Sequence, residues 1–279
     1  MIKKFFPLLD KCFSKTDREH IIRTKNIRLI PDFQNRRGGK LSYAEWAYVI
    51  GIFQTIIYQS LQKTSANNIL DIGCGTGLLG ISSEPFVSDD GQYTGIDIMK
   101  EDIEYCTGHY PSDIFKFIHL DVANATYANI QSEILKKWPI KDNSQDLVTA
   151  LSVWTHMNEN DAIFYFKEIY RVLRPGAKAI ITFFLLDQAY ITSLGKRSNE
   201  TGRFHFTNQN DWIFDVTAYN SENWMTVKSA RYPEDAIGVT QKGLEILLST
   251  SGLKLVQLYP GNWKETPGIF FQDIIILEK

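Results

Sequence analysis

The chain has 279 residues, of which 44% are hydrophobic and 22% charged, an ordinary globular composition. This length suits one large α/β domain with an elaboration, and two small domains are the alternative. The formal net charge is -2, and the pairs Arg36-Arg37 and Lys136-Lys137 are isolated and typical of solvated faces. The composition therefore gives no general attraction to nucleic acid, and we expect no nucleic-acid partner.

Three cysteines (Cys12, Cys74 and Cys106) show no pairing rhythm, so we expect no disulfide framework and no metal site. The apolar start at Met1 gives way to Asp10-Lys11, which is too soon for a signal peptide. Ala179–Leu186, the longest later apolar run, is far shorter than the roughly 20 residues of a membrane span. We expect a cytoplasmic protein without a membrane partner.

In chain order, a short helix is predicted near residues 5–13 and a longer one over Ser42–Leu61, where Ser42 and Glu45 fit a capping box. Asn68–Ile72 is predicted to be a buried strand. Short strands and helices then alternate, which indicates parallel βαβ units. The further strands are Tyr93–Asp97, Phe115–Leu120, Asp146–Leu151 and Ala177–Leu186, and the helices are Lys100–Gly108 and Glu159–Leu173.

The C-terminal end follows another pattern. A helix over Gln241–Ser251 precedes strands at Lys254–Tyr259 and Phe270–Leu277. The short link between these strands leaves no room for a crossover helix, so the pair is predicted to be antiparallel. Between Asp187 and Gly238 the sequence lacks clear periodicity and is rich in aromatic residues. Since a structureless loop of that length is improbable in a compact domain, we predict an inserted lid.

The strongest motif is Leu70-Asp71-Ile72-Gly73-Cys74-Gly75-Thr76-Gly77, a strand running into a glycine-rich turn. Alternate glycines let the backbone turn tightly and approach a ligand, and a following helix presents free N–H groups. Dinucleotide-binding enzymes use G-x-G-x-x-G instead. The spacing G-x-G-x-G therefore disfavours a nicotinamide-dependent oxidoreductase.

Two aspartates stand at the ends of later predicted strands. Asp97 ends Gly95-Ile96-Asp97-Ile98, about twenty residues after the turn, where a carboxylate can accept both ribose hydroxyls of an adenosine ligand. Asp121 ends His119-Leu120-Asp121-Val122 and is suited to accept the exocyclic amine of adenine, with Val122 against the ring. Each acid alone is weak evidence, because a strand-terminal Asp is more often a helix cap.

The order of these motifs, with Leu173-Arg174-Pro175-Gly176 after the helix, resembles the class I S-adenosylmethionine-dependent methyltransferases, in particular their bacterial small-molecule branch. The resemblance covers roughly Ile69 to Leu186. It implies a Rossmann-like, seven-stranded, mostly parallel sheet with an antiparallel last strand. S-Adenosylmethionine is the implied cofactor, and the implied contacts are Asp71, Gly73, Cys74, Gly75, Gly77, Asp97, Ile98, Asp121, Val122, Leu151, Ser152 and Tyr43.

The resemblance also suggests a division of the chain. Residues 1–65 are expected to form a helical cap, 66–186 the S-adenosylmethionine-binding core, and 187–238 the lid or substrate insert. Residues 239–279 supply a closing helix and the antiparallel hairpin of the core. Two interpretations of Tyr43 are equally open. It either contacts the methionine end of the donor or is simply an aromatic residue at the start of a helix.

The acceptor is a harder question. After the fourth strand the chain has Leu151-Ser152-Val153-Trp154-Thr155-His156, without the Asn/Asp-Pro-Pro turn of many N-methyltransferases. His156 is a candidate general base for a hydroxyl, or else a cap of the helix from Glu159 or a support for the loop. Asp187 either orients the acceptor or caps the segment that follows.

The leading hypothesis is O-methylation of a small molecule, such as a sugar or secondary metabolite, with His156 and Asp187 as catalytic candidates. N- or C-methylation without a protein base and a non-catalytic Rossmann-like binding protein remain as alternatives. Activity that survives loss of His156 would favour the first alternative. Intact donor-binding motifs argue against the second.

Overall fold

The computed structural model describes residues 6–16, 25–88, 90–122 and 135–279. The chain divides into two compact units, 1–120 and 121–279. The elements of the first unit are α1 (Phe6–Thr16), η3 (Lys25–Leu29), η4 (Phe33–Asn35), α2 (Tyr43–Ser60), β1 (Asn68–Ile72), α3 (Leu78–Ser83), η5 (Glu84–Phe86), β2 (Gln92–Asp97), α4 (Lys100–His109) and β3 (Phe115–His119).

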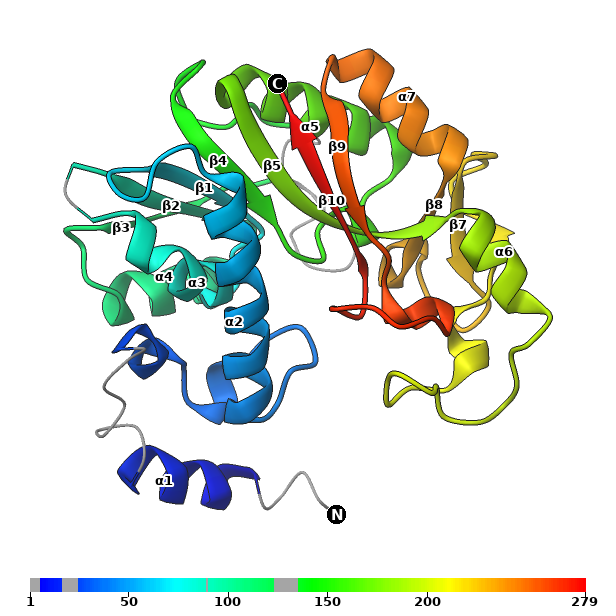
Figure 1. The fold of residues 1–279 in the computed structure, drawn as a ribbon, viewed down its shortest axis with the longest axis horizontal. Helices are drawn as coiled ribbons and strands as arrows, with labels where there is room; N and C mark the ends of the chain where they lie inside the picture. Colours follow the sequence, from blue (N-terminus) through cyan, green and yellow to red (C-terminus); the bar gives the residue numbers. More distant parts are fainter. Residues whose placement is uncertain (1–5, 17–24, 89, 123–134) are drawn as a thin grey trace. The chain divides into compact units, whose positions relative to one another are not determined.

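The strands of the first unit are parallel, with β2 paired to both β1 and β3. Helices α3 and α4 pack against these strands (Figure 1). The helix predicted from Ser42 is α2. The six apolar residues at helical spacing are buried, as the periodicity requires: Trp46, Val49, Ile50, Phe53, Ile56 and Ile57. The Ser42 hydroxyl accepts a hydrogen bond from the N–H of Glu45, as predicted. The Glu45 carboxylate accepts from the N–H of Leu41 and not from that of Ser42, so the capping box is only half formed.

The second unit contains β4 (Gln145–Ala150), η6 (Trp154–His156), α5 (Glu159–Val172), β5 (Leu173–Leu186), α6 (Gln188–Leu194), η7 (Gln209–Trp212), β6 (Phe214–Thr217), β7 (Trp224–Val227), η8 (Pro233–Asp235), β8 (Ile237–Thr240), α7 (Gln241–Ser251), β9 (Lys254–Tyr259), η9 (Asn262–Lys264) and β10 (Asp273–Glu278). Strand β5 runs parallel to β4 and β8 and antiparallel to β10. The predicted antiparallel pairing of the last two strands is confirmed in β9 and β10.

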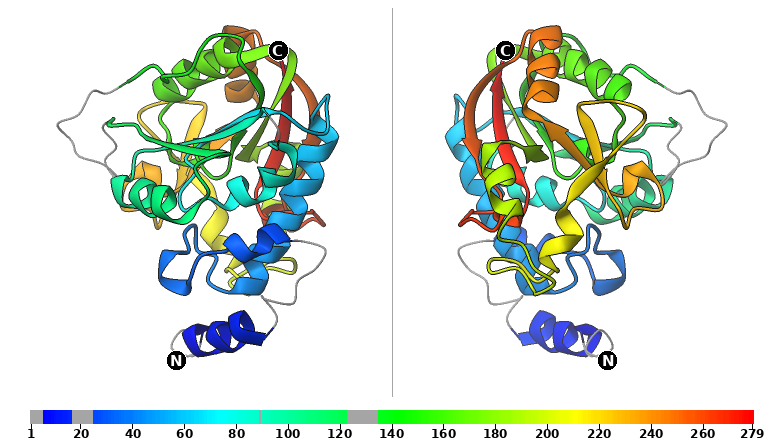
Figure 2. Two further views of the ribbon diagram at one scale, coloured as in Figure 1. Left: turned by 90° about the vertical axis from the view of Figure 1, so that its left-hand side faces the viewer. Right: turned by 90° about the vertical axis from the view of Figure 1, so that its right-hand side faces the viewer.

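The insert adds β6, β7 and β8 to the seven strands expected from the sequence, and these three run antiparallel to their neighbours within the insert. Some of its aromatic residues pack in a core and others are exposed. Tyr190 and Phe214 pack with Phe184 and Trp263, Trp212 packs against this cluster, and Trp224 is buried. Phe204, Phe206, Tyr219 and Tyr232 are exposed. Helices α5 and α7 pack against each other on the sheet of this unit (Figure 2).

Candidate active site

The glycine-rich turn of the first unit folds back onto the end of β2. The N–H groups of Gly73 and Cys74 both donate to the carbonyl of Ile96, at 2.8 and 3.1 Å. Gly73, Gly75 and Gly77 all have positive φ (64°, 49° and 91°), a conformation that other residues rarely adopt. The alternate glycines are therefore required by the backbone of the turn, as the sequence predicted.

Asp97 lies at the end of β2 and reaches the same turn. Its Oδ2 accepts from the N–H of Gly75 at 2.7 Å, and its Oδ1 accepts from the N–H of Met99 at 2.8 Å. A Cβ on Gly75 would meet only the Cβ and Cγ of Arg37, at 3.9 and 4.0 Å, which is ordinary van der Waals contact. The structure thus joins a carboxylate, which retains acceptor capacity, to the glycine turn, and this combination fits an adenosyl ligand.

Gly77 gives a testable consequence of this geometry. At φ 91°, a Cβ on Gly77 would lie 2.5 Å from the hydroxyl of Tyr110, which is fixed by its bond to the carbonyl of Thr76. We expect Gly77→Ala to reduce the free energy of unfolding by about 2–4 kcal/mol, from backbone strain and overpacking together. Urea unfolding measures this loss.

Gly108→Ala is the matched control, because Gly108 is in α4 and a Cβ there meets nothing within 4 Å. The same substitution in a helix is expected to raise the stability by up to about 1 kcal/mol. Equal stability of Gly77→Ala and the wild type would contradict the conformational requirement of the turn.

Other predicted donor contacts in the first unit have structural partners. Asp71 is buried in β1 and accepts a 2.5 Å bond from the hydroxyl of Tyr93. Tyr43 begins α2, and its hydroxyl donates to the carbonyl of Ile27 at 3.0 Å. Burial above all raises the pKa of the Cys74 thiol well above its usual value. Ile98, after Asp97, is half-buried.

Arg37 is a residue that sequence reasoning missed. Its Nε donates to both carboxylate oxygens of Asp102, at 2.9 and 3.2 Å, and the Asp102 side chain is buried. The stem of Arg37 lies over Gly75. Arg36 is not on a solvated face as expected, since it is buried and donates to the carbonyls of Pro31 and Leu41 and to Asp10. Nothing in the local sequence indicates these distant partners.

The second unit opens with Asp121, which is exposed, and Val122, which is buried. Leu151 and Ser152 directly follow β4, and both are half-buried. Ser152 has a φ of 60°, which is unusual for a residue with a Cβ. Its N–H donates to Oγ1 of Thr182 at 2.7 Å, and its hydroxyl donates to Oε1 of Gln272 at 2.9 Å. These two bonds hold the loop after β4 in a strained conformation.

His156 ends η6, four residues after Ser152. Its Nδ1 lies 2.5 Å from the carbonyl oxygen of Glu234 in η8. A carbonyl can only accept, so Nδ1 carries the hydrogen and Nε2 carries the lone pair of the neutral ring. Burial lowers the pKa of His156, against smaller opposing effects of Glu234 and Asp235. The alternative that His156 caps the following helix is wrong, because Asn158 caps α5.

Asp187 follows β5 and caps α6. Its Oδ1 accepts from the N–H of Tyr190 at 2.9 Å, and its Oδ2 accepts from Nζ of Lys264 at 2.8 Å. Lys264 is fully buried and lies 2.8 Å from Oδ1 of Asp273 as well. Both candidate catalytic side chains thus follow neighbouring parallel strands, β4 and β5, whose carboxyl ends lie at the same edge.

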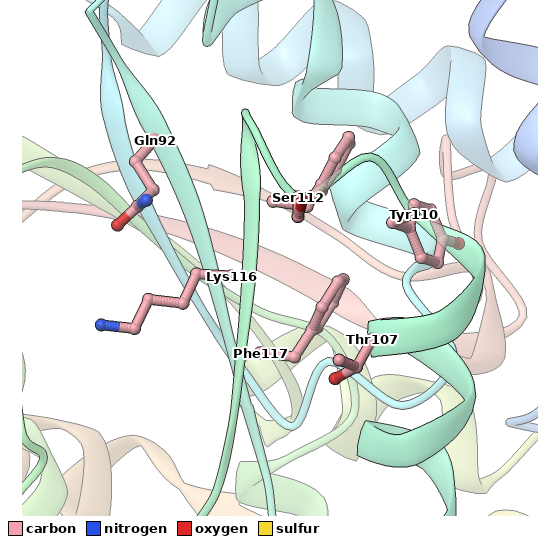
Figure 3. A pocket seen from close by; sticks show the side chains of 7 residues that line it. Gln92, Thr107, Tyr110, Ser112, Lys116 and Phe117 are labelled. Atoms are coloured by element: carbon pink, nitrogen blue, oxygen red, sulfur yellow. The ribbon is translucent and has the colours of Figure 1, made fainter.

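A pocket of about 310 Å³ lies elsewhere, beside β3 and the end of α4 (Figure 3). It is lined by Gln92, Thr107, Tyr110, Ser112, Phe115, Lys116 and Phe117. None of these residues is a predicted contact of donor or acceptor. Tyr110 connects the pocket to the glycine turn through its bond to Thr76.

Over the described ranges, no three His, Cys, Asp or Glu side chains are arranged to hold a metal ion. None of the helices in this part of the chain is both long and apolar enough to cross a bilayer.

The fold and the glycine turn with Asp97 agree with the predicted resemblance to class I, S-adenosylmethionine-dependent methyltransferases. Residues 70–181 match the family described as "Methyltransferase domain". The matched residues include the glycine turn, Asp97, Asp121 and the loop after β4.

Two curated relatives are similar to part of the chain. An "O-methyltransferase" of Pyrenophora dematioidea is 29% identical over 131 residues, covering 47% of this chain and 44% of the relative. A "Demethylmenaquinone methyltransferase" of Symbiobacterium thermophilum is 32% identical over 115 residues, covering 41% of each. The chain thus spans less than half the length of these relatives.

Solved structures share the fold at low identity. An S-adenosylmethionine-dependent methyltransferase from Mesorhizobium loti is 14% identical, with a TM-score of 0.50 and coverage of 82% of this chain and 96% of that one. The geranyl diphosphate C-methyltransferase from Streptomyces coelicolor A3(2) is 10% identical, with a TM-score of 0.51 and coverage of 85% and 81%. These similarities confirm the predicted fold class.

Proposed function

We propose that the chain transfers the methyl group of S-adenosylmethionine to a hydroxyl oxygen of a small molecule, with His156 as the general base. The observation that carries this proposal is the bond between His156 Nδ1 and the carbonyl of Glu234. It fixes the tautomer whose Nε2 is able to take a proton, while burial favours the neutral ring. The name of the Pyrenophora relative supports oxygen as the acceptor atom.

In this proposal the glycine turn and Asp97 bind the adenosyl part of the donor, and Leu151 and Ser152 contact it after β4. When bound, S-adenosylmethionine supplies an electrophilic methyl group on a sulfonium centre. His156 Nε2 would accept the hydroxyl proton of the acceptor, and the methyl group would pass to that oxygen as its bond to sulfur breaks and S-adenosylhomocysteine leaves. Asp187 orients the acceptor, held by Lys264 and by the N–H of Tyr190. The protein's main contribution is proximity and orientation.

The experiment is a transfer assay with S-adenosyl-[methyl-³H]methionine and two matched sets of acceptors. One set carries phenolic or sugar hydroxyls, and the other carries amines on the same ring systems. Label in the hydroxyl set, identified as a methyl ether by mass spectrometry, is the expected result. Label exclusively on nitrogen or carbon would contradict O-methylation and favour a mechanism without a protein base.

A further inference from the structure

Gln272 is a buried polar residue whose side chain is hydrogen-bonded to the Ser152 hydroxyl. It immediately precedes β10, which runs antiparallel to β5, so it lies toward the carboxyl end of β5. The residue is 6% exposed. Because parallel β4 and β5 end at one edge, Gln272 belongs to the same edge of the unit as Ser152 and His156.

The Gln272 amide presents its oxygen to Ser152. The Ser152 hydroxyl donates to Oε1 at 2.9 Å, and Nε2 is the other end of the amide. Nε2 has no hydrogen-bond partner among the residues that the structure describes. It is also absent from the polar atoms sealed from solvent without a partner, so it keeps access to solvent.

A buried amide with one end bonded to the protein and the other open to solvent completes its hydrogen bonds with water, which an oxygen of a ligand can replace. The loop that holds the amide carries backbone strain, since Ser152 is kept at a φ of 60° by its bonds to Thr182 and Gln272. Strain and an incomplete amide at the same place are typical of a site organised in advance for a ligand.

We propose that Gln272 is a positioning residue at the methyl-transfer centre, where its Nε2 donates to an oxygen of the methyl acceptor. This inference rests on the proposed function. The acceptor class it selects carries a hydrogen-bond-accepting oxygen at, or directly beside, the hydroxyl that is methylated. Because an N–H donor is repelled by a sulfonium cation, we assign Nε2 to the acceptor and not to the donor. The bond of Ser152 to Oε1 leaves Nε2 for this contact.

The test needs no identified acceptor, because S-adenosylmethionine is a sulfonium cation and S-adenosylhomocysteine is a neutral thioether. Gln272→Glu replaces the amide by a carboxylate of similar size, which places a negative charge at the proposed position. Calorimetry at pH 8 is expected to show that the ratio Kd(S-adenosylhomocysteine)/Kd(S-adenosylmethionine) rises about three- to tenfold over the wild type, because one added negative charge favours the cationic ligand over the neutral one. Gln257→Glu, the same change on exposed β9, is expected to leave the ratio unchanged.

Gln272→Met keeps the side-chain volume without a charge, and its missing signals assign the Gln272 amide in ¹⁵N spectra of the wild type. Those signals are expected to differ between protein saturated with S-adenosylmethionine and with S-adenosylhomocysteine, which tests the inference even if Gln272→Glu does not fold. An unchanged ratio in folded Gln272→Glu, or identical amide signals with both ligands, overturns it. A wild type that binds neither ligand refutes the proposed function itself.

Discussion

Asp97→Ala is expected to weaken the binding of S-adenosylmethionine and S-adenosylhomocysteine by about 100-fold or more. Each hydrogen bond to a charged group contributes about 1.5–3 kcal/mol, and the proposed site gives two ribose hydroxyls to this carboxylate. The variant also frees the N–H of Gly75, which now donates to Oδ2 at 2.7 Å. Isothermal titration calorimetry measures the loss for both ligands.

Asp97→Asn separates the two effects, since it keeps the shape of the side chain but not its charge. Asp113→Ala, at an exposed turn of the same unit, is the control and should bind as the wild type does. Burial raises the pKa of Asp97, while the N–H groups of Met99 and Gly75 oppose this shift. Donor affinity should therefore fall on acidification, beginning above the usual pKa of the carboxyl. Affinity of Asp97→Ala within threefold of the wild type would refute its assigned role.

His156→Gln is expected to lower kcat for a hydroxyl acceptor by about 10²- to 10⁴-fold, the usual contribution of a general base. The wild-type rate should fall at low pH, because the base must be unprotonated. Since burial lowers the pKa of His156, this loss is expected below pH 6.5. The same shift means that His156 contributes to stability above its unfolded pKa and that this contribution is lost as pH falls through its lowered folded pKa.

The pH–rate profile distinguishes a base from a structural residue. In His156→Gln the acidic limb of kcat should disappear, whereas a purely structural role would leave the shape of the profile intact. His109→Gln is the control, because His109 is an exposed histidine of α4 whose Nε2 lies 3.1 Å from the carbonyl of Leu29. Retention of the full rate in His156→Gln would show that the acceptor needs no base, as expected for an amine.

The parts of the fold that sequence predicts well depend on local patterns. The strand and glycine turn from Leu70 to Gly77 and the helix from Ser42 follow from residues that are neighbours in the chain. The C-terminal hairpin follows from the length of its link. In each case a short-range constraint, such as backbone conformation or a helix cap, determines the structure before tertiary contacts are considered.

Several contacts around the candidate residues join distant parts of the chain within each unit. Arg37 and Asp102 are 65 residues apart, His156 and Glu234 are 78 apart, and Ser152 and Gln272 are 120 apart. One sequence carries no signal for such pairings. The strands of the insert are also missed, because β6, β7 and β8 have four residues each, too few to show an alternation.

The central claim is most directly tested by calorimetric titration of the wild-type chain with S-adenosylmethionine, S-adenosylhomocysteine and NADH. We predict saturable 1:1 binding of the two adenosyl ligands and no binding of NADH, because the turn has the spacing G-x-G-x-G. A well-folded sample that binds neither adenosyl ligand, or that binds NADH instead, would contradict the assignment of this chain as a methyltransferase.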